Sequence, residues 1–208
     1  MHIMAGQFKG RKLLPPKGSK TTRPITALAR KSLFGMLEAW LPDAVVLDLF
    51  AGTGTIGIEA LSRGAELCCF AERDGQALAR LRRNIDTVGA SGRCTVWGGD
   101  VYAGLAGRLK RLGRPVDVAF VDPPYAQSRT WAWPETIRQL FAPVAAVLAH
   151  DGLVVVRTGG PLVDVPPSIA GLVVKRVKRY GDMHITFLGF PETDDSEAAP
   201  TEEDGPDG

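Results

Sequence analysis

Long apolar segments are missing from this sequence of 208 residues. No run approaches the roughly 18 to 20 residues that a helix needs to span a bilayer. The first residues, MHIMAGQFKGRK, lack the apolar centre of a signal peptide. Cysteine is scarce too: Cys68, Cys69 and Cys94 form no C-x2-C pair, and adjacent cysteines in an apolar strand usually pack in the core. These absences predict a cytoplasmic globular protein that has no contact with membranes and no metal site.

Each end of the chain lacks charge of one sign. Residues 1–31 contain eight lysines and arginines and no acid, whereas residues 192–208 contain eight acids and no base. The acidic end has no aromatic residue and no aliphatic residue larger than alanine, so we expect residues 191–208 to be a disordered tail. The basic end is typical of a surface that binds phosphates, although short basic termini also serve solubility alone.

Short apolar runs alternate with helical patterns from residue 45 onward. The runs are continuous rather than alternating, as in strands that are buried on both faces of a parallel sheet. Five such strands are predicted, at 45–50, 66–71, 93–98, 116–121 and 152–158. Helices are predicted between them, around 55–64, 75–88, 101–112 and 134–149. This alternation indicates an α/β fold with a parallel sheet covered on both faces.

The two ends of the predicted fold depart from this alternation. Residues 172–180 and 183–190 predict an antiparallel hairpin, which raises the sheet to seven strands. Near the start, Gly6 and Gly10 among short strand-like pieces predict a small β-hairpin, and Thr26 is placed to cap a following helix. We therefore expect an N-terminal basic extension, a main domain and an acidic tail, with the bounds 1–43, 44–190 and 191–208.

A glycine-rich stretch, LDLFAGTGTIGIEA, joins the first strand to the first helix of the main domain. Its Gly52, Gly54 and Gly57 satisfy G-x-G-x-x-G, a pattern that lets a ligand approach the backbone closely. Glu72, at the end of the second strand, is placed to accept hydrogen bonds from ribose hydroxyls. This pattern fits a nicotinamide or flavin enzyme as well as a methyltransferase.

Acidic residues near the ends of the strands favour S-adenosylmethionine over a dinucleotide. Asp48 suits the cationic aminoacyl end of that ligand better than a pyrophosphate, and Asp100 can accept from an adenine amino group. Asp122 ends the fourth strand beside the first, where a doubly wound sheet has its switch point. Asp48, Glu72 and Asp100 could each instead be a helix cap or a turn residue.

The residues that follow the fourth strand, DPPY at 122–125, form a stiff corner. Each proline fixes its own φ and neither offers an N–H group, so recognition is left to a carboxylate, carbonyl oxygens and an aromatic face. Asp122 and the carbonyl of Pro123 would accept from an amino group and aim its nitrogen at a methyl donor. Tyr125 would stack on a base that has left its helix or loop. The alternative is a rigid structural turn.

Over residues 3–190 the sequence resembles a known enzyme family. The resemblance rests on GQFKGRKL (6–13), TRPIT (22–26), Arg30 with Leu33 and Phe34, VLDLFAGTGTIGIEALSRGA (46–65), FAERD (70–74), Asn84, DPPY (122–125) and RYGDMHITF (179–187). These segments are similar to those of bacterial small-subunit (16S) rRNA guanine-N2-methyltransferases of the RsmD type. The glycine loop and DPPY are shared by many amino-methylating enzymes, whereas TRPIT is what points to this family.

The resemblance implies a Rossmann-like class I methyltransferase fold, S-adenosylmethionine as cofactor and the N2 of a guanine in 16S rRNA as acceptor. The partner it implies is rRNA, within assembling small subunits, and the protein is expected to be a monomer. The implied cofactor-binding residues are Asp48, Ala51, Gly52, Gly54, Glu72, Asp100 and Asp122. The implied catalytic residues are Asp122, Pro123 and Tyr125. The unopposed positive charge of the first 31 residues predicts Lys9, Arg11, Lys12, Arg23 and Arg30 as RNA-binding residues, of which the first four are expected on the same side of the fold as Tyr125.

Other functions remain open at this point. An adenine-N6 or protein-glutamine methyltransferase could use the same corner, although glutamine enzymes usually carry asparagine where Asp122 stands. DNA enzymes usually carry a larger recognition domain than this short extension. A nicotinamide-dependent oxidoreductase would leave DPPY unexplained, and a non-catalytic RNA-binding module is the fourth possibility.

Overall fold

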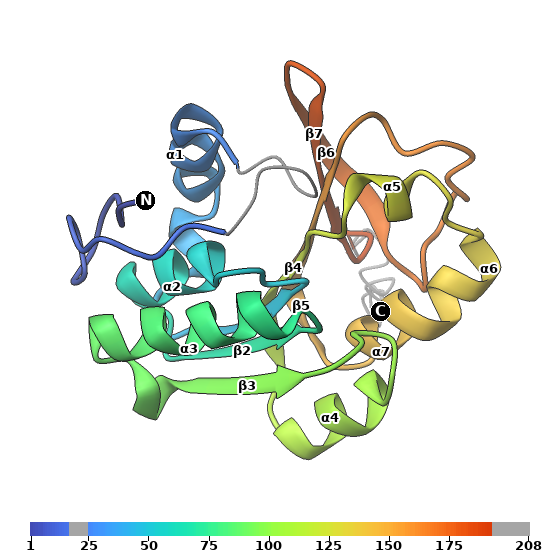
Figure 1. The fold of residues 1–208 in the computed structure, drawn as a ribbon. Coiled ribbons are helices and arrows are strands. Elements are labelled where there is room, and N and C mark those ends of the chain that lie inside the picture. Colours follow the sequence, from blue (N-terminus) through green and yellow to red (C-terminus); the bar gives the residue numbers. More distant parts are fainter. Residues whose placement is uncertain (17–24, 193–208) are drawn as a thin grey trace, which may run out of the picture.

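A single seven-stranded sheet forms the centre of the computed structural model, which describes residues 1–16 and 25–192 (Figure 1). The strand order is β3-β2-β1-β4-β5-β7-β6. Neighbours from β3 to β5 are parallel, while β7 runs antiparallel to both β5 and β6. The predicted α/β fold with a C-terminal antiparallel hairpin is confirmed. The predicted tail lies, from residue 193 on, outside the described residues.

The elements follow the predicted ranges closely. The strands are β1 (Val45–Leu49), β2 (Leu67–Glu72), β3 (Cys94–Gly98), β4 (Val116–Val121), β5 (Leu148–Thr158), β6 (Val173–Tyr180) and β7 (Met183–Gly189). The α-helices are α1 (Ala27–Met36), α2 (Thr55–Ser62), α3 (Gly75–Val88), α4 (Leu105–Leu112), α5 (Tyr125–Ser128), α6 (Trp133–Thr136) and α7 (Ala142–Ala145). Short 3-10 turns cover Glu38–Trp40 (η1) and Ser91–Arg93 (η2), and a π-helical turn, η3 (Ile137–Phe141), joins α6 to α7.

Besides the start of α4, at Leu105 rather than 101, two predicted boundaries differ clearly from the observed ones. The helix predicted over 134–149 is divided into α6, η3 and α7, because Pro143 has no N–H to continue a regular α-helical ladder. β5 begins at Leu148 rather than 152, since Leu148 already pairs with Val116 of β4. Neither difference moves the carboxyl end of a strand.

Apolar side chains cover both faces of the sheet. Helices α1, α2 and α3 pack on one face, and α4, η3 and α7 pack on the other. Cys68 and Cys69 point to opposite faces, and both are buried in the core as predicted. Within residues 1–16 and 25–192, none of the helices combines the length and apolarity that crossing a membrane requires.

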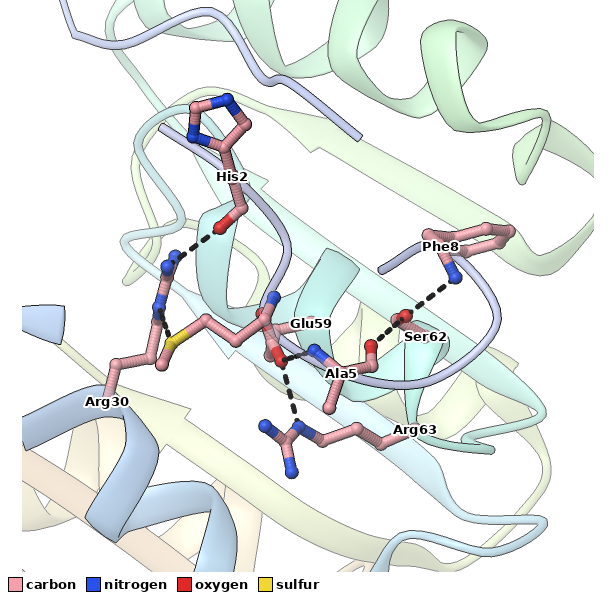
Figure 2. A network of polar contacts seen from close by, with 8 residues as sticks. His2, Ala5, Phe8, Arg30, Glu59, Ser62 and Arg63 are labelled. Atoms are coloured by element: carbon pink, nitrogen blue, oxygen red, sulfur yellow. Dashed lines mark hydrogen bonds and ion pairs between the residues drawn. The ribbon is translucent and has the colours of Figure 1, made fainter. Parts of the chain in front are cut away.

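The N-terminal segment forms a rudimentary version of the predicted β-hairpin. His2 and Lys12 form an antiparallel bridge, which is flanked by backbone hydrogen bonds from the N–H of Ile3 to the carbonyl of Arg11 (3.0 Å) and from the N–H of Leu13 to the carbonyl of Met1 (2.7 Å); the described residues do not extend this pairing into regular strands. The turn between the two ends bonds to α2. The buried carboxylate of Glu59 accepts from the backbone N–H groups of Met4 (2.9 Å) and Ala5 (3.1 Å), as Figure 2 shows for Ala5. Because these donors are satisfied by a helix side chain, they need no partner strand.

Candidate active site

The glycine loop lies at the carboxyl edge of the parallel strands, between β1 and α2. Phe50 opens it with φ of 66°, a strained conformation for an aromatic residue and one that clusters at functional sites. Gly57 lets α2 pack directly on β2, since a Cβ there would lie 2.3 Å from Cε1 of Phe70. On the outer side of the loop, no described atom lies within 4 Å of a Cβ built on Gly52. The loop is therefore packed tightly on the side that faces β2, and its opposite side, at Gly52, has room for a ligand.

Asp48 fixes the glycine loop through a buried hydrogen bond. It is 2 % exposed, and its carboxyl oxygen Oδ2 accepts from the N–H of Gly57 at 2.9 Å. Burial raises the pKa of Asp48 to about 8; the hydrogen bond from Gly57 opposes this shift, and the charges of Asp122 and Glu72 add to it. Asp48 is therefore largely protonated at neutral pH. Its observed contact is with α2, so direct contact with a ligand remains a prediction.

Glu72 links the glycine loop to the next helix. One carboxylate oxygen accepts from the N–H of Gly52 and the other from the N–H of Asp74, both at 2.7 Å. A carboxylate has about four lone-pair positions, so Glu72 keeps capacity for hydroxyl donors. Asp100 lies nearby, because the N–H of Gly99 donates to the carbonyl of Glu72 at 3.0 Å. Asp100 is exposed and accepts from a backbone N–H two residues further on.

The DPPY corner holds the most strongly paired charge at this edge. Asp122 follows β4 and forms a bidentate ion pair with Arg157 of β5: Nε to Oδ1 is 2.7 Å and Nη2 to Oδ2 is 2.6 Å. The side chains are 18 % and 12 % exposed. Burial lowers the pKa of Arg157, but the charge and hydrogen bonds of Asp122 outweigh it, so that pKa lies above its ordinary value. Such a fork fixes the plane of the carboxylate.

Tyr125 begins α5, directly after the two prolines. Its ring packs on the backbone of Gly159, where a Cβ would lie 2.3 Å from the ring atom Cδ2. The guanidinium carbon of Arg157 lies 5.9 Å from the ring centroid, within the range of a cation–π contact. Pro123 is buried beneath the corner. Asp122, Arg157 and Tyr125 thus form one rigid unit.

The charge of this edge indicates which kind of ligand fits. Asp48 is largely protonated, and the charge of Asp122 is already paired with Arg157. Glu72 and Asp100 adjoin each other, and neither forms an ion pair with a described base. A ligand with a sulfonium and an ammonium group is attracted to these two carboxylates, whereas a pyrophosphate is repelled. The residues therefore fit S-adenosylmethionine and not a dinucleotide.

Basic residues of the N-terminal segment lie elsewhere. Arg11 donates to the carbonyl of Thr87 at the end of α3, and Figure 1 shows this segment against the ends of α2 and α3 that lie far from α5. The expectation that Lys9 and Arg11 lie on the same side as Tyr125 is wrong. The reason is the anchoring of the segment to the last turn of α2.

The other predicted RNA contacts have different environments. Arg30 is 5 % exposed, and its guanidinium donates to the carbonyl of His2 at 2.8 Å, so in the structure it fastens the N-terminal segment to α1. Lys12 is exposed beside His2, and Arg23 lies outside the described residues.

Sequence reasoning missed Arg157. It stands in GLVVVRT, where the apolar run alone indicated a buried strand. A usable signal was present: one arginine near the end of a buried strand requires an anion, and Asp122 ends the adjacent strand one position past Val121, which pairs with Val156.

The sheet order, the glycine loop after β1 and the acidic corner after β4 together define a class I methyltransferase fold. The chain belongs to the family described as "Conserved hypothetical protein 95", whose profile matches residues 1–189.

Named relatives agree with this class. "Putative rRNA methyltransferase YlbH" of Bacillus subtilis is 33 % identical over 181 residues, which cover 87 % of this chain and 94 % of that protein. "Ribosomal RNA small subunit methyltransferase D" of Escherichia coli K12 is 38 % identical over 125 residues, 60 % of each chain. The solved structure of "Putative methyltransferase yhhF" from Escherichia coli has a TM-score of 0.73 at 32 % identity, covering 90 % of this chain and 96 % of that one.

Proposed function

We propose that this protein transfers the methyl group of S-adenosylmethionine to the exocyclic N2 of a guanine in small-subunit rRNA. The observation that carries the proposal is the Asp122–Arg157 pair, fixed beside the glycine loop at the carboxyl edge of the sheet. The substrate is the rRNA of assembling small subunits in the cytoplasm, and the protein acts as a monomer.

Residues around the glycine loop would hold the cofactor, which supplies an electrophilic methyl group on a positively charged sulfur. Glu72 would accept from the ribose hydroxyls and Asp100 from the adenine amino group. The backbone of Ala51, Gly52 and Gly54 allows close approach. The acidic character of this edge favours the cation over the neutral product, which helps release after transfer.

Asp122 orients the acceptor amine. Arg157 occupies one lone pair on each carboxylate oxygen, so about two remain for N–H donors. With the carbonyl of Pro123, Asp122 accepts from the amine and turns its nitrogen lone pair out of the base plane toward the methyl group. The ring of Tyr125 holds the base. Orientation is the main contribution, and the product amine loses its proton readily.

The chemistry of the corner favours guanine over adenine. Guanine presents N1–H and N2–H side by side, and both are donors that a carboxylate accepts. In adenine the amino group adjoins an acceptor, N1, whose lone pair opposes the carboxylate. Two of the named relatives are rRNA methyltransferases by name, and one of these is named for the small subunit.

The test measures label transfer from methyl-labelled S-adenosylmethionine to naked small-subunit rRNA and to partly assembled subunits. Asp122→Ala should lose at least about 100-fold in rate, while Asp122→Asn, which keeps one acceptor oxygen, should lose less. Both variants should bind S-adenosylmethionine in calorimetry as the wild type does. Near-normal transfer by Asp122→Ala, or no transfer to either RNA by the wild type, would refute the proposal.

A further inference from the structure

Strand β6, at the edge of the sheet, carries an unusual concentration of positive charge. Its sequence is VVKRVKRY, and residues 174–179 are all exposed. The four basic residues Lys175, Arg176, Lys178 and Arg179 define what we call the β6 basic track. No acid occurs between Asp164 and Asp182 in the sequence.

Most of this charge is not neutralised within the described part of the chain. Lys175 has one partner, Glu192, at 3.4 Å, and the carboxylate of Glu192 is 95 % exposed, so the pair is weak. Arg179 donates to the carbonyl of Gly181 at 2.9 Å, which leaves its charge unpaired. Arg176 and Lys178 form no ion pair with a described acid.

The track leads to the DPPY corner. β6 runs parallel to β5 through the antiparallel β7, so its last residues lie at the carboxyl edge of the sheet. Arg179 pairs with His184, which pairs with Thr158, the residue after Arg157. Two strand spacings of about 4.8 Å place the backbone of Arg179 about 10 Å from that of Thr158.

The hairpin that carries the track is firmly held. The hydroxyl of Tyr180 is hydrogen-bonded to Oγ of Ser32 on α1 at 2.6 Å, and Sδ of Met183 lies 3.8 Å from Nη1 of Arg157. Figure 1 shows the β6–β7 hairpin projecting beyond the rest of the sheet. Exposed cations along a fixed edge strand suit a polyanion that follows that edge.

We propose that the β6 basic track binds the phosphate backbone of the RNA substrate and guides it to the DPPY corner. This inference rests on the proposed function and replaces Lys9 and Arg11 as the expected phosphate contacts. Arg176 and Lys178 lie on one face of the strand, about 6.6 Å apart, and Arg179 projects from the other face at the end nearest the corner, so an RNA backbone that follows the exposed edge of β6 can contact all three. The rival explanation is that charge on an edge strand only prevents association of sheets.

The experiment compares two triple variants of the full chain. The first is Arg176→Gln, Lys178→Gln and Arg179→Gln. The matched control is Arg82→Gln, Lys110→Gln and Arg111→Gln, which removes the same charges from exposed positions of α3 and α4. Binding of a small-subunit rRNA transcript is measured by fluorescence anisotropy between about 50 and 300 mM KCl, a range in which phosphate contacts dominate affinity.

We expect the track variant to bind RNA at least about tenfold more weakly near physiological salt. The slope of log K against log salt should fall by about 2 to 3. The control should change both quantities much less, and S-adenosylmethionine affinity should stay at the wild-type value in both variants. Each single substitution should lower the slope by about 0.7 to 0.9.

Different results overturn different claims. If the track variant binds RNA with wild-type affinity and salt slope, the claim that the β6 basic track binds RNA is overturned. Self-association of that variant would then favour the rival explanation, that the charge prevents sheets from associating. Absence of methyl transfer by the wild type, with RNA binding that still depends on the track, would overturn the proposed function alone.

Discussion

At the scale of single residues, the site depends on pairing Asp122 with Arg157. Asp122 could be recognised from DPPY, because the prolines and the strand before it limit what the corner can do. Arg157 turns a free carboxylate into an oriented acceptor, and its two hydrogen bonds are each of the strong, charge-assisted kind. In the proposed mechanism, Arg157 is thus a positioning residue.

Replacing Arg157 tests this role. Arg157→Ala should lower the rate of methyl transfer about 10- to 100-fold, since losing a charge-assisted hydrogen bond costs about 1.5 to 3 kcal/mol. Arg157→Lys should recover part of the rate, because it keeps the charge and loses the fork. Single-turnover kinetics with saturating S-adenosylmethionine measures the rate, and calorimetry checks that cofactor affinity is retained. An unchanged rate in Arg157→Ala would contradict the positioning role.

Asp48 predicts a dependence of stability on pH. Its pKa is about 8 in the folded protein and near 3.8 in the unfolded chain. Between these values the folded state holds a proton that the unfolded state has lost, so this residue's contribution to stability falls as pH rises from about 4 to about 8. Asp48→Asn removes this pH-dependent loss of stability, because asparagine does not titrate, and its amide oxygen can still accept from the N–H of Gly57.

Urea unfolding of Asp48→Asn and the wild type at several pH values measures this effect. The difference in unfolding free energy, variant minus wild type, should increase by about a few kcal/mol as the pH rises from 5 to 8. A constant difference across that range would show that Asp48 does not carry the raised pKa.

At the scale of elements, the fold was predictable and the placement of the N-terminal segment was not. Continuous apolar runs located β1 to β5, as expected for strands of a covered parallel sheet, while β6 and β7 were located as a hairpin. The prediction for the N-terminal segment used only its charge, which indicated RNA binding beside Tyr125, and its glycines, which indicated a hairpin. Its position is instead decided by long-range hydrogen bonds to Glu59 and Ser62, which nothing local in residues 1–16 specifies. Arg157 was missed for a similar reason, since its partner lies on another strand.

Glu59 is the element-scale test. Glu59→Ala leaves the N–H groups of Met4 and Ala5 and the Nε of Arg63 without their acceptor, at a cost of at least about 1 to 3 kcal/mol in unfolding free energy. Urea unfolding measures the loss, and limited proteolysis should show faster cleavage near the N-terminus. Glu66→Ala, which breaks an exposed ion pair with Arg114, is the control and should change stability little. Equal stability of the two variants would contradict the anchoring role.

At the scale of the whole molecule, the candidate site and the anchored N-terminal segment lie at opposite ends of the helices that cover the sheet. The carboxyl edge carries the acids that we propose to bind the cofactor and the acceptor amine, and exposed cations lie on the β6 hairpin beside it. The N-terminal segment packs at the far end of α2 and completes one side of the core. In the proposed function, methyl transfer and RNA binding therefore belong to one edge, and the opposite end contributes to stability.

The most direct test of the central claim is the identity of the methylated nucleoside. Small-subunit rRNA that lacks the modification is treated with the protein and S-adenosylmethionine, digested to nucleosides and analysed by mass spectrometry. The account predicts N2-methylguanosine as the product with the wild type, and its near disappearance with Asp122→Ala. N6-methyladenosine, or a methylated product that persists undiminished in Asp122→Ala, would contradict it.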